Sequence, residues 1–199
     1  MTPLRADASW FAAVADRSSA DELQAFYEAN PEYWHITHGH RPEPGEAADG
    51  FDFRPPADMA YRDQLTWLLR DRATERVIGI VSVVTDLLAP GVIHLSFFMV
   101  ETARHGGDLA SEVYAAYEAW AVKQGARWLR LGVVAANRRG EAFWRRQGYV
   151  EVKRREGFAL GARTHQLIVM VKPIPPNTLA EFLEAVPRDR PDQVSASPP

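Results

Sequence analysis

A short glycine-containing segment lies between a predicted strand and a predicted helix, and its residue types suit phosphate binding. Residues 104–107 read Arg-His-Gly-Gly, and the helix is predicted to begin at Leu109. The first amides of a helix have no partner within it, so they can donate hydrogen bonds to a bound phosphate. Glycine lets the backbone approach such a ligand closely, and Arg104 and His105 add positive charge. A Gly-Gly pair alone is a weak motif, because most such pairs are simply turns.

The elements that would position this segment form a series of strands and helices. Strands rich in β-branched residues and bounded by turn residues are predicted at residues 64–70, 76–85, 92–100, 127–135, 149–155 and 165–172. Helices are predicted at residues 109–124, 139–147 and 178–186, the last opening with a capping box of Thr178 and Glu181. The order indicates an α/β chain in which a meander of antiparallel strands precedes a β-loop-α-β-α-β part.

The two ends of the chain are less regular. Ser19 and Glu22 have capping-box spacing at the start of a helix that Asn30-Pro31 would end. Residues 38–56 are rich in Pro, Gly, Asp and Glu, which predicts a surface loop that is mobile in part. We expect one domain over residues 1–173, and a short helix with a disordered tail over residues 174–199. The first nine residues lack the basic and apolar runs of a signal peptide.

Two motifs at a characteristic separation indicate a family. Residues 100–110 (VETARHGGDLA) and residues 137–149 (NRRGEAFWRRQGY) together resemble the acetyl-CoA-binding core of the GNAT N-acetyltransferases. Residues 26–34 (FYEANPEYW) are also similar to an EANPEYF-like segment of a bacterial GNAT subgroup. The resemblance extends over residues 65–173. It implies a mixed α/β GNAT fold, with a mostly antiparallel central sheet, a splayed strand pair and helices on both faces.

The resemblance also implies a binding site for acetyl-CoA as co-substrate. Backbone groups of Phe98, Met99 and Val100 would hold the pantetheine arm and polarise the thioester carbonyl, and Asn137 would contact the same arm. The basic cluster on the second helix includes Arg139, which is in register with the family signature and could meet the 3′-phosphate of CoA; otherwise this cluster is a solvated face. The diphosphate would be bound by the loop and the first helical turn, formed by His105, Gly106, Gly107, Asp108, Leu109 and Ala110.

The chain departs from the family pattern at two of these positions and at Trp144. His105 stands at an Arg/Gln position and Asp108 at a glycine, whereas Ala110 occupies the position of the second small residue. Asp108 either repels the diphosphate or serves as the helix N-cap, and we favour the cap. Trp144 occupies the place of a Tyr that protonates the leaving thiolate in many GNAT enzymes. Indole cannot supply that proton, so water or another group would have to do so.

Candidates for the base that deprotonates the acceptor amine come from two segments. His94 lies on the strand beside the expected gap, and an unperturbed imidazole with a pKa of about 6.5 suits proton transfer. Glu32, Tyr33 and His35 form a rival set, because the family builds its acceptor site partly from amino-terminal helices. The alternative is structural in both cases: His94 as a hydrogen-bonded sheet residue, and Tyr33 as a packing residue under the helix.

Composition excludes several other kinds of chemistry. The chain has 199 residues, a net charge of −3 and no cysteine, so disulfides, thiolate metal sites and a covalent Cys intermediate are ruled out. The charge balance argues against nucleic-acid or anionic-membrane binding. His35, His38 and His40 suggest a metal site, but without a carboxylate or Cys at ligand spacing we interpret them as loop polarity and expect no metal.

These observations predict a cytoplasmic N-acetyltransferase, monomeric or homodimeric, that transfers acetyl directly from acetyl-CoA to an amine of a small molecule or a peptide. One alternative is a degenerate GNAT that binds acyl-CoA as a sensor without turnover, which Asp108 and Trp144 favour. Another is acyl transfer to a hydroxyl group.

Overall fold

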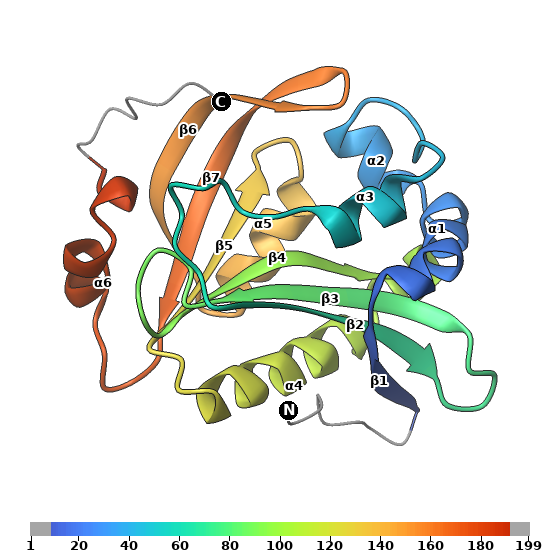
Figure 1. The fold of residues 1–199 in the computed structure, drawn as a ribbon, viewed down its shortest axis with the longest axis horizontal. Helices are drawn as coiled ribbons and strands as arrows, with labels where there is room; N and C mark the ends of the chain where they lie inside the picture. The colour runs from blue at the N-terminus through green and yellow to red at the C-terminus, as the bar shows by residue number, and fades with distance from the viewer. Residues whose placement is uncertain (1–8, 192–199) are drawn as a thin grey trace.

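A single mixed sheet of seven strands forms the centre of the fold (Figure 1). The computed structural model describes residues 9–191, and the predictions for residues 1–8 and for the end of the tail lie outside this range. The strands are β1 (Trp10–Ala15), β2 (Asp63–Asp71), β3 (Val77–Thr85), β4 (Val92–Val100), β5 (Trp128–Val134), β6 (Val150–Leu160) and β7 (Arg163–Pro173). They lie in the order β1-β2-β3-β4-β5-β7-β6, and every neighbouring pair is antiparallel except β4 and β5.

The parallel pair is incomplete. Pairing between β4 and β5 runs from Val92–Trp128 to Leu95–Leu131 and then stops, although both strands continue. A bulge in β4 coincides with this point, because the register with β3 passes from Val83–Leu95 to Ser82–Phe97 and leaves Ser96 without a partner. A bulge bends its strand and increases the local twist. The predicted splayed strand pair is therefore confirmed.

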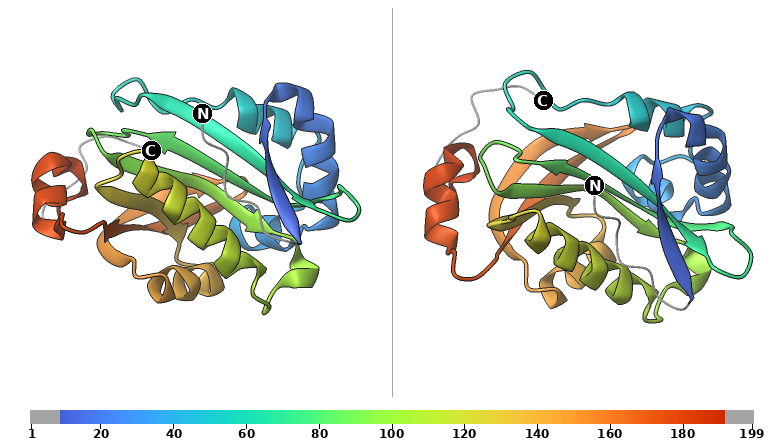
Figure 2. Two further views of the ribbon diagram at one scale, coloured as in Figure 1. Left: turned by 90° about the horizontal axis from the view of Figure 1, so that it is seen from below. Right: turned by 60° about the horizontal axis from the view of Figure 1, so that its bottom comes forward.

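Helices cover both faces of the sheet, as predicted (Figure 2). The apolar side chains of α4 (Leu109–Lys123) join the largest core cluster, together with Trp144 of α5 (Arg138–Arg146). The opposite face carries α1 (Ala20–Ala29), α2 (Glu32–Thr37) and α3 (Glu46–Asp52), whose apolar residues pack on β2, β3 and β4. No helix within residues 9–191 is long and apolar enough to cross a membrane.

The carboxy-terminal helix is part of this layered arrangement. Phe182 of α6 (Leu179–Ala185) and Val186 after it are buried in a third cluster with Trp128 and Val171 of the sheet. The predicted capping box of Thr178 and Glu181 is present in full. Figure 1 shows α6 at one side of the sheet, beside β6 and β7.

Three features of the amino-terminal third differ from prediction. Strand β1 was not predicted, and α3 forms inside residues 38–56, which the sequence indicated to be loop. The helix starting after Ser19 exists, but the side chain of Ser19 makes no capping bond. Glu22 is instead engaged by Arg70, whose two terminal nitrogens both lie 2.6 Å from the carboxylate. A strong ion pair with β2 thus replaces the weaker local cap.

Close packing of β3 against its neighbours gives a stability prediction. A Cβ at Gly79 would lie 2.6 Å from the carbonyl oxygen of Met99 and 2.8 Å from Leu69, and the backbone cannot yield easily. We expect Gly79→Ala to lower the free energy of unfolding by about 2–3 kcal/mol, the scale of overpacking effects. Denaturant unfolding would measure it. Gly50→Ala is the control, because an added Cβ in exposed α3 contacts nothing within 4 Å; an equal loss in both variants would contradict this account.

Candidate functional site

The exposed edge of β4 is the first part of the candidate site. Beyond Leu95 the backbone groups of β4 that face β5 have no partner on that strand. Phe97 turns toward α1 and α2, where it contacts Tyr27, Tyr33 and Trp34, whereas Phe98 packs on Phe143 and Trp144 of α5. The predicted pantetheine-binding residues Phe98, Met99 and Val100 thus all lie on the unpaired part of β4. Unpaired backbone donors and acceptors of this kind can bind the amides of an extended ligand.

The loop between β4 and α4 presents free amides at the start of the helix. Asp108 is the N-cap residue, but its side chain makes no capping hydrogen bond. Within the described residues, no carbonyl outside α4 accepts from the amides of Gly106, Leu109 or Ala110; the bonds recorded here are Gly107 to Arg104 and Glu112 to Asp108. The predicted role of Asp108 as a side-chain cap is therefore wrong. These amides stay available to an anion at the positive end of the helix dipole.

Arg104 does not contribute free positive charge to this loop, contrary to prediction. Its guanidinium lies 2.6 Å from Asp71 and 2.5 Å from Glu101. The hydrogen bond from Arg104 is the main cause that lowers the pKa of Asp71 to about 2. These two ion pairs hold the loop against the end of β2, and the Arg104 guanidinium is therefore not available to a ligand.

Glu32 lies beside the loop, away from the paired part of β4. One carboxylate oxygen is 3.7 Å from Nδ1 of His105 and the other is 3.8 Å from Arg139 on α5. Nε2 of His105 lies 3.1 Å from the carbonyl oxygen of Val100, which can only accept, so Nε2 carries the proton. Nδ1 of His105 therefore points at an anion, and it is buried without a hydrogen-bond partner in residues 9–191. A phosphate oxygen could take the place of the Glu32 carboxylate between His105 and Arg139, and Nδ1 would donate to it only in the doubly protonated imidazolium form.

Asn137 is the N-cap residue of α5, the helix formed by the second sequence motif (residues 137–149). Its side-chain oxygen accepts from the amide of Gly140 at 2.9 Å, which caps the helix. A Cβ at Gly140 would lie 2.7 Å from Nδ2 of Asn137, so a larger residue there would require the Asn137 side chain to shift. The side-chain amide nitrogen donates to no described residue, which leaves it available for the predicted contact with a pantetheine arm.

His94 lies at the paired end of β4 in a charged cluster. Its Nδ1 is 3.2 Å from Arg130 of β5, which can only donate, so Nδ1 accepts and Nε2 carries the proton. Burial, and then the Arg130 charge, lower the pKa of His94 to about 3. Arg130 in turn lies 2.7 Å from Asp189, a fully buried residue of the short 3-10 helix Pro187–Asp189. Such a weakly basic imidazole is a poor acceptor of an ammonium proton, which favours the structural interpretation of His94.

Tyr33 contacts the unpaired part of β4 from the α2 side. Its ring centroid lies 5.2 Å from that of Phe97 and 5.2 Å from that of Trp34. Burial raises the pKa of Tyr33 to about 12, so the phenol stays protonated and can only act as a donor or acceptor of a hydrogen bond near neutral pH. The catalytic assignments of His94, Tyr33 and Glu32 stay predictions, and none of the three has the properties of a strong base directed at an acceptor.

Trp144 belongs to the core. Its ring packs on Phe98, Tyr114 and Tyr149, with only 8% of the residue exposed. Burial raises the pKa of both tyrosines well above the ordinary value. These phenols are weak acids, so neither readily supplies a proton in place of the indole.

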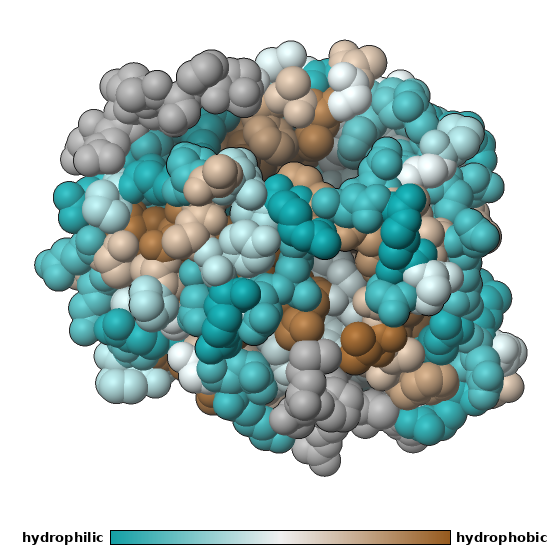
Figure 3. Space-filling view, viewed as in Figure 1, coloured by the Kyte–Doolittle hydropathy of each residue, from teal (hydrophilic) through white to brown (hydrophobic). Residues whose placement is uncertain are grey.

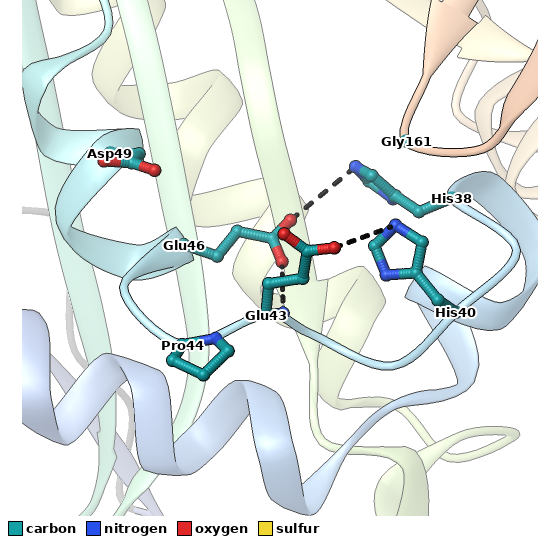
Figure 4. A pocket seen from close by; sticks show the side chains of 7 residues that line it. All are labelled: His38, His40, Glu43, Pro44, Glu46, Asp49 and Gly161. Atoms are coloured by element: carbon teal, nitrogen blue, oxygen red, sulfur yellow. Dashed lines mark hydrogen bonds and ion pairs between the residues drawn. The ribbon is translucent and has the colours of Figure 1, made fainter.

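The histidines of residues 38–40 line a shallow pocket between α3 and the β6–β7 turn (Figure 4). Nε2 of His38 lies 3.6 Å from Glu46, and Nε2 of His40 lies 3.8 Å from Glu43. Across residues 9–191, no group of three or more His, Cys, Asp or Glu side chains is arranged to hold a metal ion.

On the face of the molecule seen in Figure 1, the hydrophobic residues lie mostly in recesses between hydrophilic ones (Figure 3).

Sequence reasoning missed Arg130 and Asp189. They are 59 residues apart, and no local motif joins them. The one signal in the sequence was Arg130 itself, a charged residue inside an otherwise apolar strand. A buried arginine needs a counterion, so a distant carboxylate could have been expected.

The chain belongs to the acetyltransferase (GNAT) family. The model of that family matches residues 20–149, which contain the unpaired β4 edge, the free-amide loop and Asn137. The family uses acetyl-CoA, and its chemistry is acetyl transfer. No curated protein matches the sequence. The subgroup suggested by residues 26–34 stays a prediction.

Solved structures share the fold at low sequence identity. An acetyltransferase from Thermus thermophilus is 19% identical with a TM-score of 0.65, covering 83% of this chain and 97% of that one. An acetyl transferase from Salmonella typhimurium that modifies the N-terminal serine of a ribosomal subunit protein is 13% identical with a TM-score of 0.68, covering 86% and 98%. A Vibrio cholerae spermidine N-acetyltransferase, solved with CoA and spermine, is 11% identical with a TM-score of 0.63, covering 84% and 96%.

The depressed pKa of His94 predicts a pH dependence of stability. The unfolded chain binds a proton at His94 near pH 6.5, whereas the folded protein does so only near pH 3. Stability therefore falls as the pH drops through this window, by up to about 1.4 kcal/mol per pH unit for one proton. Unfolding free energies of wild type and His94→Gln between pH 7 and 4 would test it. The variant should show the shallower slope, and parallel slopes would refute the assignment.

The uncapped Asp108 carboxylate predicts an effect on acetyl-CoA affinity. Its negative charge adjoins the free amides and opposes a diphosphate without serving the helix. We expect Asp108→Asn to lower the Kd for acetyl-CoA about 3- to 10-fold, the scale of one solvent-screened charge contact. The gain should shrink at high salt. Glu112→Gln removes the same charge one helical turn further on and is the control; weaker binding by Asp108→Asn would show that the carboxylate helps.

Proposed function

We propose that this protein is an acetyl-CoA-dependent N-acetyltransferase that transfers acetyl directly to a primary amine of a small molecule or a peptide. The observation that carries the proposal is the juxtaposition of two sets of unpaired backbone groups. One set is the β4 edge beyond Leu95, and the other is the start of α4, which follows β4 directly. A ligand with an amide-containing arm and a diphosphate matches both.

The co-substrate would extend along this path. Its pantetheine amides would pair with the backbone of Phe98 to Val100, and the side-chain amide of Asn137 would donate to the same arm. Its diphosphate would accept from the amides of Gly106, Leu109 and Ala110. Nδ1 of His105 would also donate to it when the imidazole is doubly protonated, once the carboxylate of Glu32 is displaced. Arg139, half-exposed on α5, is placed to meet a phosphate.

The reaction needs a neutral amine, an electrophilic carbonyl and a proton for the leaving thiolate. The amine lone pair attacks the thioester carbon, a backbone N–H of β4 stabilises the developing oxyanion, and the C–S bond breaks. A thiol has a pKa of about 8.5, so CoA can leave as the thiolate without an acid, and solvent supplies its proton. Solvent also removes the amine proton in this scheme, because His94 is only weakly basic and Glu32 faces the loop.

The competing function is an acyl-CoA sensor without turnover. Two observations favour it: the uncapped carboxylate of Asp108 at the diphosphate position, and the buried Trp144 where an acid would stand. A sensor would bind acyl-CoA and leave the thioester intact.

Titration calorimetry and a thiol-release assay together test these functions. We expect acetyl-CoA to bind, and acetyl-pantetheine, which lacks the diphosphate, to bind at least 10-fold more weakly because it cannot use the loop amides. Thiol release should then increase with at least one member of a panel of primary amines, and the rate should rise with pH toward the pKa of the amine. Acetyl-CoA binding without release for any amine would support the sensor, and equal affinities for both thioesters would overturn the assignment of the loop.

A further inference from the structure

The buried Asp189 marks an anion-binding cluster on the sheet face opposite α4. Both oxygens of Asp189 contact Arg130, at 2.7 and 3.2 Å, and one of them also lies 2.6 Å from Arg155 of β6. Two guanidinium groups from different strands therefore share one carboxylate, and that carboxylate comes from the carboxy-terminal segment. Although burial opposes it, the two arginines hold the pKa of Asp189 below its ordinary value.

Within residues 9–191, two guanidinium groups in this cluster share one carboxylate. Asp189 is the counterion of both Arg130 and Arg155. The imidazole of His94 is neutral in the folded protein. Burial, and the repulsion from Arg130 and Arg188, lower the pKa of Arg155 against the attraction of Asp189. Uncompensated charge at a partly buried position is costly unless an anion approaches it.

Arg155 also has an unused hydrogen-bond donor. Its Nε is buried and donates to no described residue, and Asp189 is the one carboxylate within reach of its guanidinium in residues 9–191. The side chain is nevertheless 19% exposed, so a ligand can approach it. A water molecule or an acceptor atom of a ligand would satisfy this donor.

The cluster adjoins the place where β4 and β5 separate. Arg130 pairs with His94, one position before the last paired residues of these strands. Gly132 follows on the same face of β5, where the side chain of Leu167 would lie 3.2 Å from an added Cβ, and its partner Val169 pairs with Lys153. Two residues on, Val134 pairs with Leu167, which pairs with Arg155. Arg155 therefore stands two strands, or about 10 Å, from β5 at the splayed end.

We propose that the acceptor amine carries a carboxylate, and that Arg155 binds this group beside Asp189 while the amine reaches the splayed edge of β4. This specificity rests on the proposed N-acetyltransferase function. Amino acids of various chain lengths, and peptides whose first residue is acidic, both present an amine and a carboxylate. A carboxylate bound to the exposed part of the Arg155 guanidinium would compensate its charge, and a small shift of the side chain would let the same carboxylate accept from Nε.

Matched acceptors test the proposal. Glycine, β-alanine and γ-aminobutyrate would be compared with their amides, which keep the amine and lose the charge, and the tripeptide amide Asp-Ala-Ala with Asn-Ala-Ala. We expect the carboxylate member of the preferred pair to have a KM at least 10-fold lower. Whether a free amino acid or the peptide is preferred distinguishes the two sources.

Variants separate recognition from structural damage. Arg155→Gln should raise the KM of the carboxylate acceptor about 10-fold more than the KM of its amide, with a larger effect on KM than on kcat. Arg154→Gln is the matched control, because Arg154 points to the other face and pairs with Glu151. Thermal unfolding confirms that each variant is folded. Equal KM values for acid and amide in the wild type, or equal losses for both in Arg155→Gln, would overturn the proposal.

Binding measurements keep the two proposals distinguishable. If no acceptor is acetylated, calorimetric titration of the same pairs in the presence of CoA replaces the kinetics. Preferential binding of carboxylates that depends on Arg155 would then support the anion subsite while the proposed transfer reaction fails. Turnover of amines without any preference for a carboxylate would refute the subsite and leave the N-acetyltransferase function standing.

Discussion

The separation of β4 from β5 after four paired residues is the constraint on which the site depends. A continuous parallel pair would satisfy every backbone group along both strands and leave nothing for a ligand. The bulge at Ser96 ends that pairing while β4 stays bonded to β3. The unsatisfied groups then lie along an edge that leads directly into the loop before α4, so one irregularity in one strand creates an extended backbone-binding surface.

Most of the fold could be predicted from local patterns. The β-branched run at residues 77–85 and the apolar spacing of residues 109–123 produced strand and helix limits that agree with the structure to within a residue or two. The failures have identifiable causes. Strand β1 is short and makes its ladder with β2, more than fifty residues away, so its neighbours in the sequence carry no sign of it. Helix α3 forms in a segment with many helix-breaking residues because Ala47 and Phe51 pack against α1 and the sheet, which overrides intrinsic propensity.

The site was predictable to the extent that its chemistry is local. The local geometry of Phe98 to Val100, of Gly106 and Gly107, and of Asn137 could be anticipated, because backbone amides and a helix cap are determined by residues a few positions apart. The surroundings of Arg104 and His94 could not be anticipated, since they depend on partners from other strands: Asp71 for Arg104 and Arg130 for His94. Nothing in the sequence indicated that the Asp108 side chain makes no capping bond. Distant ion pairs decide which charged side chains are neutralised and which remain for a ligand.

Because Asp189 is buried, the cooperatively folded part of the protein extends beyond the last strand of the sheet. The last strand finishes at Pro173, and a fragment cut there would contain every residue that the family model matches. It would nevertheless leave Arg130 without its counterion and strip Trp128 of its contacts with Phe182 and Val186. Removing one partner of a buried ion pair costs about 3–5 kcal/mol, a large part of the stability of an average domain. The segment up to Asp189 is thus part of the cooperative fold, and we expect an expression fragment that retains it to be the more stable one.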